Sequence, residues 1–138
     1  MLPIRRPLAV VTALAVVACT AAVALAAGAK FTGTTEQNRP VSFKLADGKA
    51  KNFKGGINMF CSKSGIQFNT AIPPKAMKVK DKKFHYKGRD KSDSTNIEIN
   101  GKINGKNASG KIKMSDSTYY SSGTDFCSGV AKWTAKKG

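Results

Sequence analysis

Histidine, acidic residues and cysteine are scarce in this sequence of 138 residues, and each scarcity excludes a class of function. One histidine, His85, and 8 acidic residues against 24 lysines and arginines leave few groups that transfer protons near neutral pH. No cysteine or histidine has a partner at metal-ligand spacing, so we expect neither a metal site nor a cofactor. We therefore expect a non-enzymatic protein without catalytic residues.

The N-terminal segment, residues 1–29, has the layout of a secretory signal peptide. Arg5 and Arg6 form a basic start, an apolar run follows, and small residues close the segment. Small residues at the −3 and −1 positions predict cleavage near residues 26–29. The sequence thus predicts a secreted or extracytoplasmic bacterial protein whose single domain covers residues 30–138.

Three other interpretations of this segment stay open. The apolar run over residues 8–27 has the length of an uncleaved membrane anchor, which needs about 20 residues. The pair Arg5-Arg6 resembles a twin-arginine export signal. Residues 16–19 resemble a lipobox, in which Cys19 would carry a lipid anchor, although the residues that follow stay apolar where a lipoprotein begins a polar tether.

Export leaves the positive charge with the folded part of the chain. Without Arg5 and Arg6, the remaining 22 basic residues against 8 acidic residues give a net charge of +14. Only Arg39 and Arg89 are arginines, so lysine carries almost all of the charge. Base-specific readout of nucleic acids relies mainly on bidentate arginine, which argues against sequence-specific nucleic-acid binding.

Cleavage removes Cys19 and leaves Cys61 and Cys127, an even pair in a small exported domain. Such a pair predicts one disulfide bond. In the chain-entropy model, closing a loop of about 65 residues stabilises the fold by roughly 4 kcal/mol. A catalytic cysteine with His85 as its base would leave the second thiol unexplained and the base without an orienting group.

Helical periodicity is missing from the mature chain, whereas alternation with a period of two recurs throughout. We therefore expect an all-β domain, an antiparallel meander of eight or nine short strands that forms a small barrel or a sandwich. The expected strands are residues 30–35, 41–45, 53–61, 65–72, 77–80, 83–88, 96–103, 108–114 and 127–136.

One face of each expected strand carries the large apolar side chains, and these define the expected core. In strand 65–72 we place Ile66 and Phe68 on this inward face. The interior is either filled by its own side chains or leaves a pocket for a small apolar ligand. The other large inward side chains are Phe31, Phe43, Phe53, Phe84, Tyr86 and Trp133.

One tight turn has a clear signal, and a second is coherent with the apolar pattern of its strands. The dipeptide Asn104-Gly105 favours a two-residue turn, which would place Ile97 opposite Ile112. A two-residue loop at residues 81–82 would place Val79 opposite Phe84. Both assignments keep apolar side chains on one face of their hairpins, so the turn chemistry and the apolar pattern agree.

Two further turns are less regular. A loop over residues 62–65 would bring Cys61 opposite Ile66. A two-residue loop at residues 47–48 leaves the apolar residues of its strands out of step. We therefore expect a β-bulge near residues 55–56.

Several short motifs follow one another along the mature chain. The segment 31–35 is followed by a cysteine at the end of the third strand and by Gly-x-Ile repeats, and the chain ends with Cys127-Ser128-Gly129 and then Trp133-Thr134-Ala135-Lys136. In this order the chain resembles a group of small secreted bacterial β-meander proteins of unassigned function. The resemblance implies an exported β domain with one cysteine pair and a C-terminal Trp-Thr-Ala strand, and it transfers no active site.

Lysines alternate with the inward residues, so we expect a lysine-rich outer surface on the sheet. We predict that this surface binds an anionic partner weakly and electrostatically, namely an acidic polysaccharide, an envelope glycopolymer or an anionic membrane surface. Outward lysines also serve solubility and protect strand edges, so a purely structural exported protein is the competing interpretation. The expected anion-binding residues are Lys78, Lys80, Lys82, Lys83, Lys87, Arg89, Lys91, Lys102, Lys111 and Lys113.

A second binding hypothesis places a small molecule or a peptide at the mouth of a barrel. Tyr119 and Tyr120 lie in an expected polar loop, residues 115–125, where adjacent tyrosines suit a contact surface. A catalytic role would need convergent acidic side chains, but those of the expected loops are interpreted as solvated turn residues. They are Asp90, Asp93, Asp116 and Asp125.

Overall fold

The computed structural model describes residues 28–92 and 95–138, so most of the expected signal peptide, including Cys19, lies outside the described residues, as does Asp93. The regular elements in the described part are β-strands, and no helix there is long and apolar enough to cross a membrane. The strands are β1 (Ala29–Thr35), β2 (Pro40–Ala46), β3 (Lys49–Cys61), β4 (Gly65–Ala71), β5 (Met77–Lys78), β6 (Lys83–Arg89), β7 (Asn96–Asn104), β8 (Asn107–Tyr120) and β9 (Gly123–Lys137).

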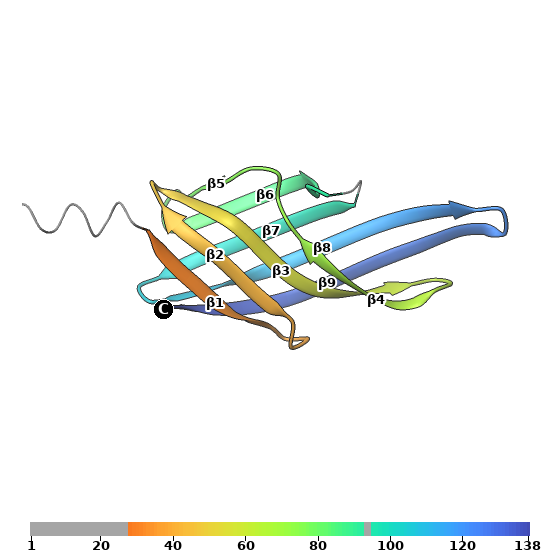
Figure 1. The fold of residues 1–138 in the computed structure, drawn as a ribbon, viewed down its shortest axis with the longest axis horizontal. Coiled ribbons are helices and arrows are strands. Elements are labelled where there is room, and N and C mark those ends of the chain that lie inside the picture. Colours follow the sequence, from red (N-terminus) through yellow and green to blue (C-terminus); the bar gives the residue numbers. More distant parts are fainter. Residues whose placement is uncertain (1–27, 93–94) are drawn as a thin grey trace, which may run out of the picture.

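All of these strands pair antiparallel in a single sheet, in the order β4-β3-β2-β1-β9-β8-β7-β6 (Figure 1). Two further pairings bend the sheet toward a ring. The short strand β5 pairs with β3 through Met77 and Ala50, and a bridge between Lys80 and Lys83 joins the chain after β5 to β6. The expected all-β antiparallel meander is therefore confirmed.

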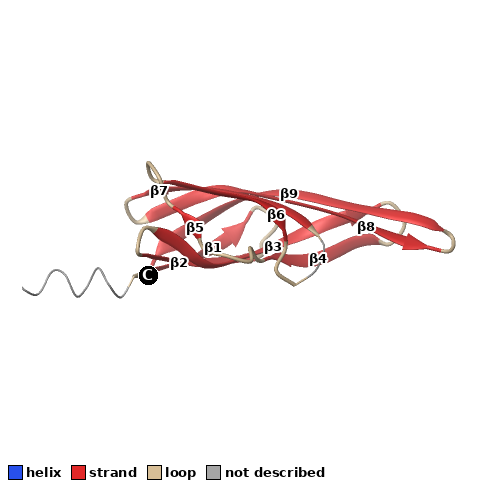
Figure 2. Ribbon diagram, turned by 90° about the horizontal axis from the view of Figure 1, so that it is seen from above, coloured by secondary structure: helices blue, strands red, loops and turns tan. Residues whose placement is uncertain are grey.

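The molecule has two parts, which differ in what lies between the strands β3 and β9. The β1–β2 hairpin separates them at one end, and beyond its tip they pair directly at Cys61 and Cys127. A Cβ atom at Gly129 would lie 2.5 Å from the carbonyl oxygen of Asn58, so this close approach requires glycine. Past this point the β3–β4 and β8–β9 hairpins extend away from the ring (Figures 1 and 2). We call residues 58–71 and 115–130 the distal hairpins, and the remaining strands the proximal end.

The core of the proximal end is built from aromatic rings. Phe31 stacks on Phe43 with ring centroids 4.9 Å apart, and Phe84 stacks on Trp133 at 6.1 Å. Phe53 stacks on Phe43 with an offset and contacts Trp133 edge-on. Aromatic pairs at such distances attract beyond their buried area. The rings lie against one another, so side chains fill the space between them.

The β7–β8 hairpin turns one residue later than expected, which moves its register by two. The turn is Gly105-Lys106 instead of Asn104-Gly105, and Ile97 faces Met114 rather than Ile112. Gly105 has φ 61°, as the first central position of a type II′ turn requires. A shift by two residues leaves every side chain on its predicted face.

The β3–β4 hairpin differs from the prediction by one residue, with a larger consequence. Cys61 pairs with Gly65 rather than with Ile66, and Gly65 closes the shorter loop with φ 79°. A one-residue shift exchanges the two faces of a strand. Ile66 and Phe68 therefore point outward with 65% and 51% of their surface exposed, and their assignment to the core is wrong.

The turns at residues 47–48 and 81–82 lie where the sequence predicts them. The predicted bulge exists between β2 and β3, but its place differs. The register shifts between the partners of Ser42 and Lys44, opposite Asn52, which has φ 53°, and not at residues 55–56. Asparagine tolerates the left-handed conformation that lets β3 take in the extra residue.

The prediction of a polar loop at residues 115–125 is wrong. β8 and β9 stay paired out to Tyr120 and Gly123, so that only residues 121–122 form the turn. This stretch lacks the apolar alternation of a half-buried strand because it extends beyond the core. Tyr119 and Tyr120 consequently lie at the end of a strand, both exposed.

Candidate anion-binding surface

Four lysines form a continuous row across the outer face of β6, β7, β8 and β9. Lys83 stands directly opposite Lys102, and Lys111 stands directly opposite Lys132. Lys102 and Lys111 are diagonal neighbours, because Lys102 pairs with Ser109, two residues before Lys111. Directly opposite residues lie about 4.5–5.5 Å apart at Cβ, and like charges at this spacing destabilise a sheet. We call these four residues the lysine quartet.

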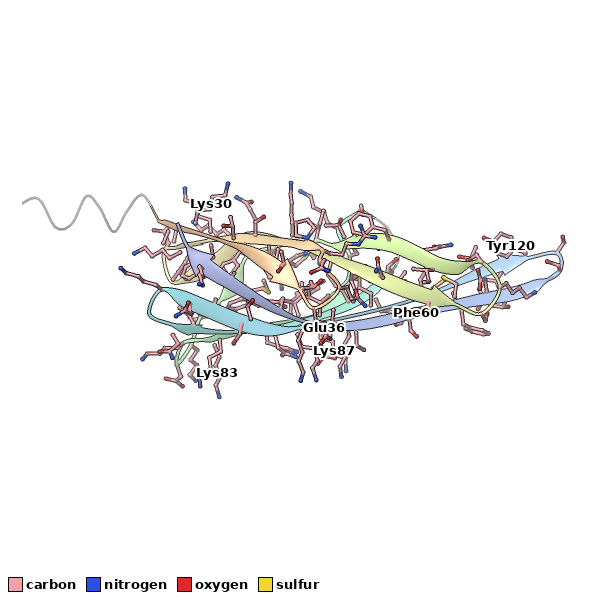
Figure 3. The ribbon with its side chains drawn as sticks, turned by 90° about the horizontal axis from the view of Figure 1, so that it is seen from below. Lys30, Glu36, Phe60, Lys83, Lys87 and Tyr120 are labelled. Carbon is pink, nitrogen blue, oxygen red and sulfur yellow. A yellow bond between two sulfur atoms is a disulfide. The ribbon has the colours of Figure 1, made fainter. Side chains whose placement is uncertain are left out.

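A second row of lysines lies across β1, β2 and β3. Lys44 stands opposite Lys30 on one side and opposite Lys51 on the other. Figure 3 shows Lys30 and Lys83 on opposite sides of the ribbon, so the two rows face different directions. We call this set the lysine triad, and part of its charge is neutralised because Lys51 Nζ lies 2.7 Å from the carboxylate of Asp47.

No acidic side chain of the described residues forms an ion pair with a quartet lysine, but the Glu36 carboxylate accepts a hydrogen bond from the backbone amide of Lys132 at 3.0 Å. In the part of the chain that the structure describes, the ion pairs are Lys51–Asp47 and His85–Glu98, the latter at 3.6 Å, and neither includes a quartet lysine. In the strand register Glu98 stands opposite Lys87 and Lys113, which lie outside the quartet. The quartet is thus a row of four lysines, none of which has an ion-pair partner among the described residues.

The structure brings some of the predicted anion-binding residues together and separates others. Lys83, Lys102 and Lys111 belong to the quartet. Its fourth member, Lys132, is not among the predicted anion-binding residues. Its outward position is readable from the sequence, since it lies between inward Ala131 and Trp133. The remaining predicted residues lie in three other places. Lys87 and Lys113 lie beside Glu98. Lys78, Lys80 and Lys82 lie in β5 and the turn after it, and Arg89 and Lys91 lie at the far end of β6.

A groove of about 810 Å³ adjoins the quartet on the outer face of the sheet. Hydroxyl groups line it, with Thr34 directly opposite Thr134 and Thr134 directly opposite Ser109. Lys102 of the quartet and Lys136 lie at its sides. This arrangement places hydrogen-bonding hydroxyls within the same surface as the positive charge of the quartet.

Asp125 is buried, with 1% of its surface exposed, so its interpretation as a solvated turn residue is wrong. Its Oδ1 accepts hydrogen bonds from the Lys63 amide at 2.8 Å and from the Ser62 hydroxyl, and its Oδ2 accepts one from the Ser64 hydroxyl at 2.6 Å. The Ser64 bond, followed by the Lys63 bond, holds the pKa of Asp125 below its ordinary value of 3.8. The carboxylate ties the β3–β4 loop to β9 and has a structural role.

Asp90 is also buried, again against the prediction for a turn residue. It accepts hydrogen bonds from the amide of Ile72 at 2.6 Å and from the hydroxyl of Ser92 at 2.6 Å. These contacts join the segment after β4 to the segment after β6. Asp116 is half-buried on β8. His85 lies exposed on β6, where its acidic neighbour is Glu98 at 3.6 Å.

The predicted disulfide between Cys61 and Cys127 is confirmed, with an S–S distance of 2.05 Å. It joins β3 to β9 where these strands begin to pair directly. The bond is consistent with an extracytoplasmic location. Asp125 lies close to both sulfur atoms, but the disulfide leaves no thiolate there to ligate a metal ion.

Comparison with protein-family models, curated proteins and solved structures found no match for this chain. The resemblance to small secreted bacterial β-meander proteins therefore stays a prediction.

Proposed function

We propose that this protein is an exported, non-enzymatic binding protein whose lysine quartet holds an anionic polysaccharide or envelope glycopolymer. The observation that carries the proposal is the row of lysines across four paired strands. Export rests on the N-terminal segment and is supported by the disulfide, which persists in oxidising compartments.

The lysines of each directly opposed pair repel one another. Lys83–Lys102 and Lys111–Lys132 each place like charges where a sheet gains from opposite charges, and such pair energies are roughly 0.2–1 kcal/mol. A polyanion laid across the row relieves this repulsion and releases its own counterions. A bound polyanion therefore gains affinity from counterion release and also stabilises the folded sheet.

The type of basic residue favours a polymer of irregular geometry. Lysine is a compact charge on a flexible stem, whereas arginine recognises planar groups in a fixed bidentate geometry. A row of lysines thus follows a chain whose anionic groups vary in spacing. The hydroxyl-lined groove beside the quartet adds hydrogen bonds of the kind that sugar rings accept and donate.

Affinity chromatography on heparin, and on an immobilised envelope glycopolymer, tests the proposal. The variant K111Q/K132Q removes two charges from the quartet, and the matched control K30Q/K44Q removes two charges from the lysine triad. We expect the wild-type protein to elute with salt, the quartet variant to elute at clearly lower salt, and the control to shift less.

Two results would contradict the proposal. Equal shifts for both variants would show that only net charge matters and that the quartet is not a site. A wild-type protein that is not retained at low salt would favour the purely structural interpretation of the lysines.

A further inference from the structure

Large apolar side chains are exposed together on the outer face of the distal hairpins. They come from all four distal strands, and each has at least half of its surface exposed. Soluble proteins rarely expose a contiguous apolar surface unless it makes contact with something. We call this set the apolar patch, and its members are Phe60, Ile66, Phe68, Tyr119, Phe126 and Val130.

The pairing of the strands makes the patch continuous, with Phe60 at its centre. Phe60 stands directly opposite Ile66 on β4 and directly opposite Ser128 on β9. Phe126 and Val130 flank Ser128 on the same face, at the diagonal positions that aromatic side chains reach. Phe60 and Phe126 expose 59% and 64% of their surface, so neither contributes much to the core.

Charge is excluded from this face but present at its border. Residues 55–74 and 114–130 contain only Lys63, Asp116 and Asp125 as charged side chains. By register, Asp116 and Asp125 belong to the opposite face, and Lys63 lies in a loop.

At the proximal border of the patch two cations stand next to apolar members. The guanidinium of Arg39 lies 4.3 Å from the ring centre of Phe68, and Lys113 stands opposite Val130. An apolar centre with a cationic border is thus the pattern that any partner of this face has to match.

We propose that the apolar patch docks the protein on an anionic lipid bilayer, with the aromatic rings at the level of the headgroups and the bordering cations on lipid phosphates. This inference goes beyond the proposed function, because both the ligand and the residues differ. Aromatic side chains favour the membrane interface, and bordering lysines and arginines gain from anionic lipids.

Charge complementarity selects the bilayer over a second copy of this chain. A second copy facing the patch carries the same net charge of +14 after export, with 22 basic and 8 acidic residues, so the two copies repel each other. An anionic bilayer instead accepts both parts of the surface. Figure 3 shows Phe60 and Tyr120 toward the distal end of the molecule, away from Lys30 and Lys83.

Vesicle co-sedimentation of the full mature protein, with its disulfide intact, tests the docking. The vesicles are phosphatidylcholine alone or phosphatidylcholine with phosphatidylglycerol, at about 0.1 M and about 0.5 M NaCl. We expect wild-type protein to bind the phosphatidylglycerol vesicles and to keep part of this binding at high salt. The variant F60S/F126S should lose at least ~10-fold in vesicle affinity, since two exposed rings no longer enter the interface.

Two controls separate this docking from folding and from polymer binding. The matched variant S115A/S117A changes the same face and keeps the aromatic rings, so it should bind vesicles like the wild type. Thermal unfolding and heparin elution of F60S/F126S should match those of the wild type, because these rings are exposed and carry no charge. Loss of vesicle binding with unchanged heparin elution thus assigns lipid contact to the patch.

Three outcomes would overturn the inference. F60S/F126S could bind vesicles as well as the wild type, or the wild type could lose all vesicle binding at high salt, which would leave charge as the sole cause. Analytical ultracentrifugation could also show a wild-type dimer that F60S/F126S dissociates, which would assign the patch to a second copy. Failure of the lysine quartet as a polymer site would appear separately, in the heparin elution of K111Q/K132Q.

Discussion

The proximal end and the distal hairpins share β3, β8 and β9 but differ in where their large aromatic side chains lie. At the proximal end Phe43 and Trp133 point inward and lysines point outward. In the distal hairpins Phe60 points outward, while polar Gln67 and Thr118 occupy the inner face. Side chains alternate between the two faces of the strands in both parts, so this alternation alone does not determine which face is buried.

The difference follows from what each inner face meets. The proximal strands curve into a ring, so their inner faces pack on one another and exclude water. The distal hairpins extend past the ring and gain little from an apolar inner face. Their attachment depends instead on the disulfide and on the hydrogen bonds of Asp125. Contacts between the two hairpins replace a core there.

Truncation of one phenylalanine in each part should have very different effects on the free energy of unfolding. We expect Phe43→Ala to lower the free energy of unfolding by about 3–5 kcal/mol, because Phe43 contacts Phe31, Phe53 and the other core rings. Phe60→Ala should change it by less than about 0.5 kcal/mol. Urea unfolding followed by tryptophan fluorescence measures both values, and comparable losses would contradict the outward placement of Phe60.

The sequence predicts the proximal end well because its inward residues are large and regularly spaced. Phe31, Phe43 and Trp133 lie inside as predicted, and the error at the β7–β8 turn leaves all faces unchanged. Lysines adjacent to these residues are outward for the same reason. Which lysines oppose one another depends on the register across strands, so the quartet could be predicted only in part.

The distal hairpins were poorly predicted because remote contacts determine them. The β3–β4 register depends on a loop whose Ser62 and Ser64 bind Asp125, more than 60 residues along the chain, and no local pattern reveals this contact. The part of β8 beyond Met114 carries serine and threonine where a half-buried strand carries apolar residues. Counting back from Trp133 in steps of two, however, places Phe126 and Val130 outward from the sequence alone.

The charge of Asp125 should make the distal attachment sensitive to acid. The fold lowers the pKa of this carboxyl group, so the ionised form stabilises the folded protein above about pH 3.8, and the contribution disappears as the pH falls through the lower folded-state pKa. Asp125→Asn keeps the shape and removes the charge. We expect it to unfold at a lower temperature than the wild type at neutral pH, with a difference that shrinks below about pH 3.8.

Asp47→Asn is the matched control for this experiment. The hydrogen bond and the charge of Lys51 lower the pKa of Asp47 too, but this pair is exposed and solvent screens it. Its effect on the unfolding temperature should be smaller at every pH. An equal acid response of both variants would show that burial of Asp125 between the distal hairpins does not matter.

The smallest expected effect concerns the outer face of the proximal end, where the sign of a change should depend on the residue opposite. Lys111→Glu places a carboxylate against Lys132 and should raise the free energy of unfolding by about 0.2–1 kcal/mol. Lys113→Glu makes the same change in net charge but stands opposite Glu98, so it should lower that free energy by a similar amount. Urea unfolding at low ionic strength measures both, and added salt should reduce both effects. If the two variants shift in the same direction, net charge rather than cross-strand pairing controls stability, and the lysine quartet carries no local repulsion for an anionic polymer to relieve.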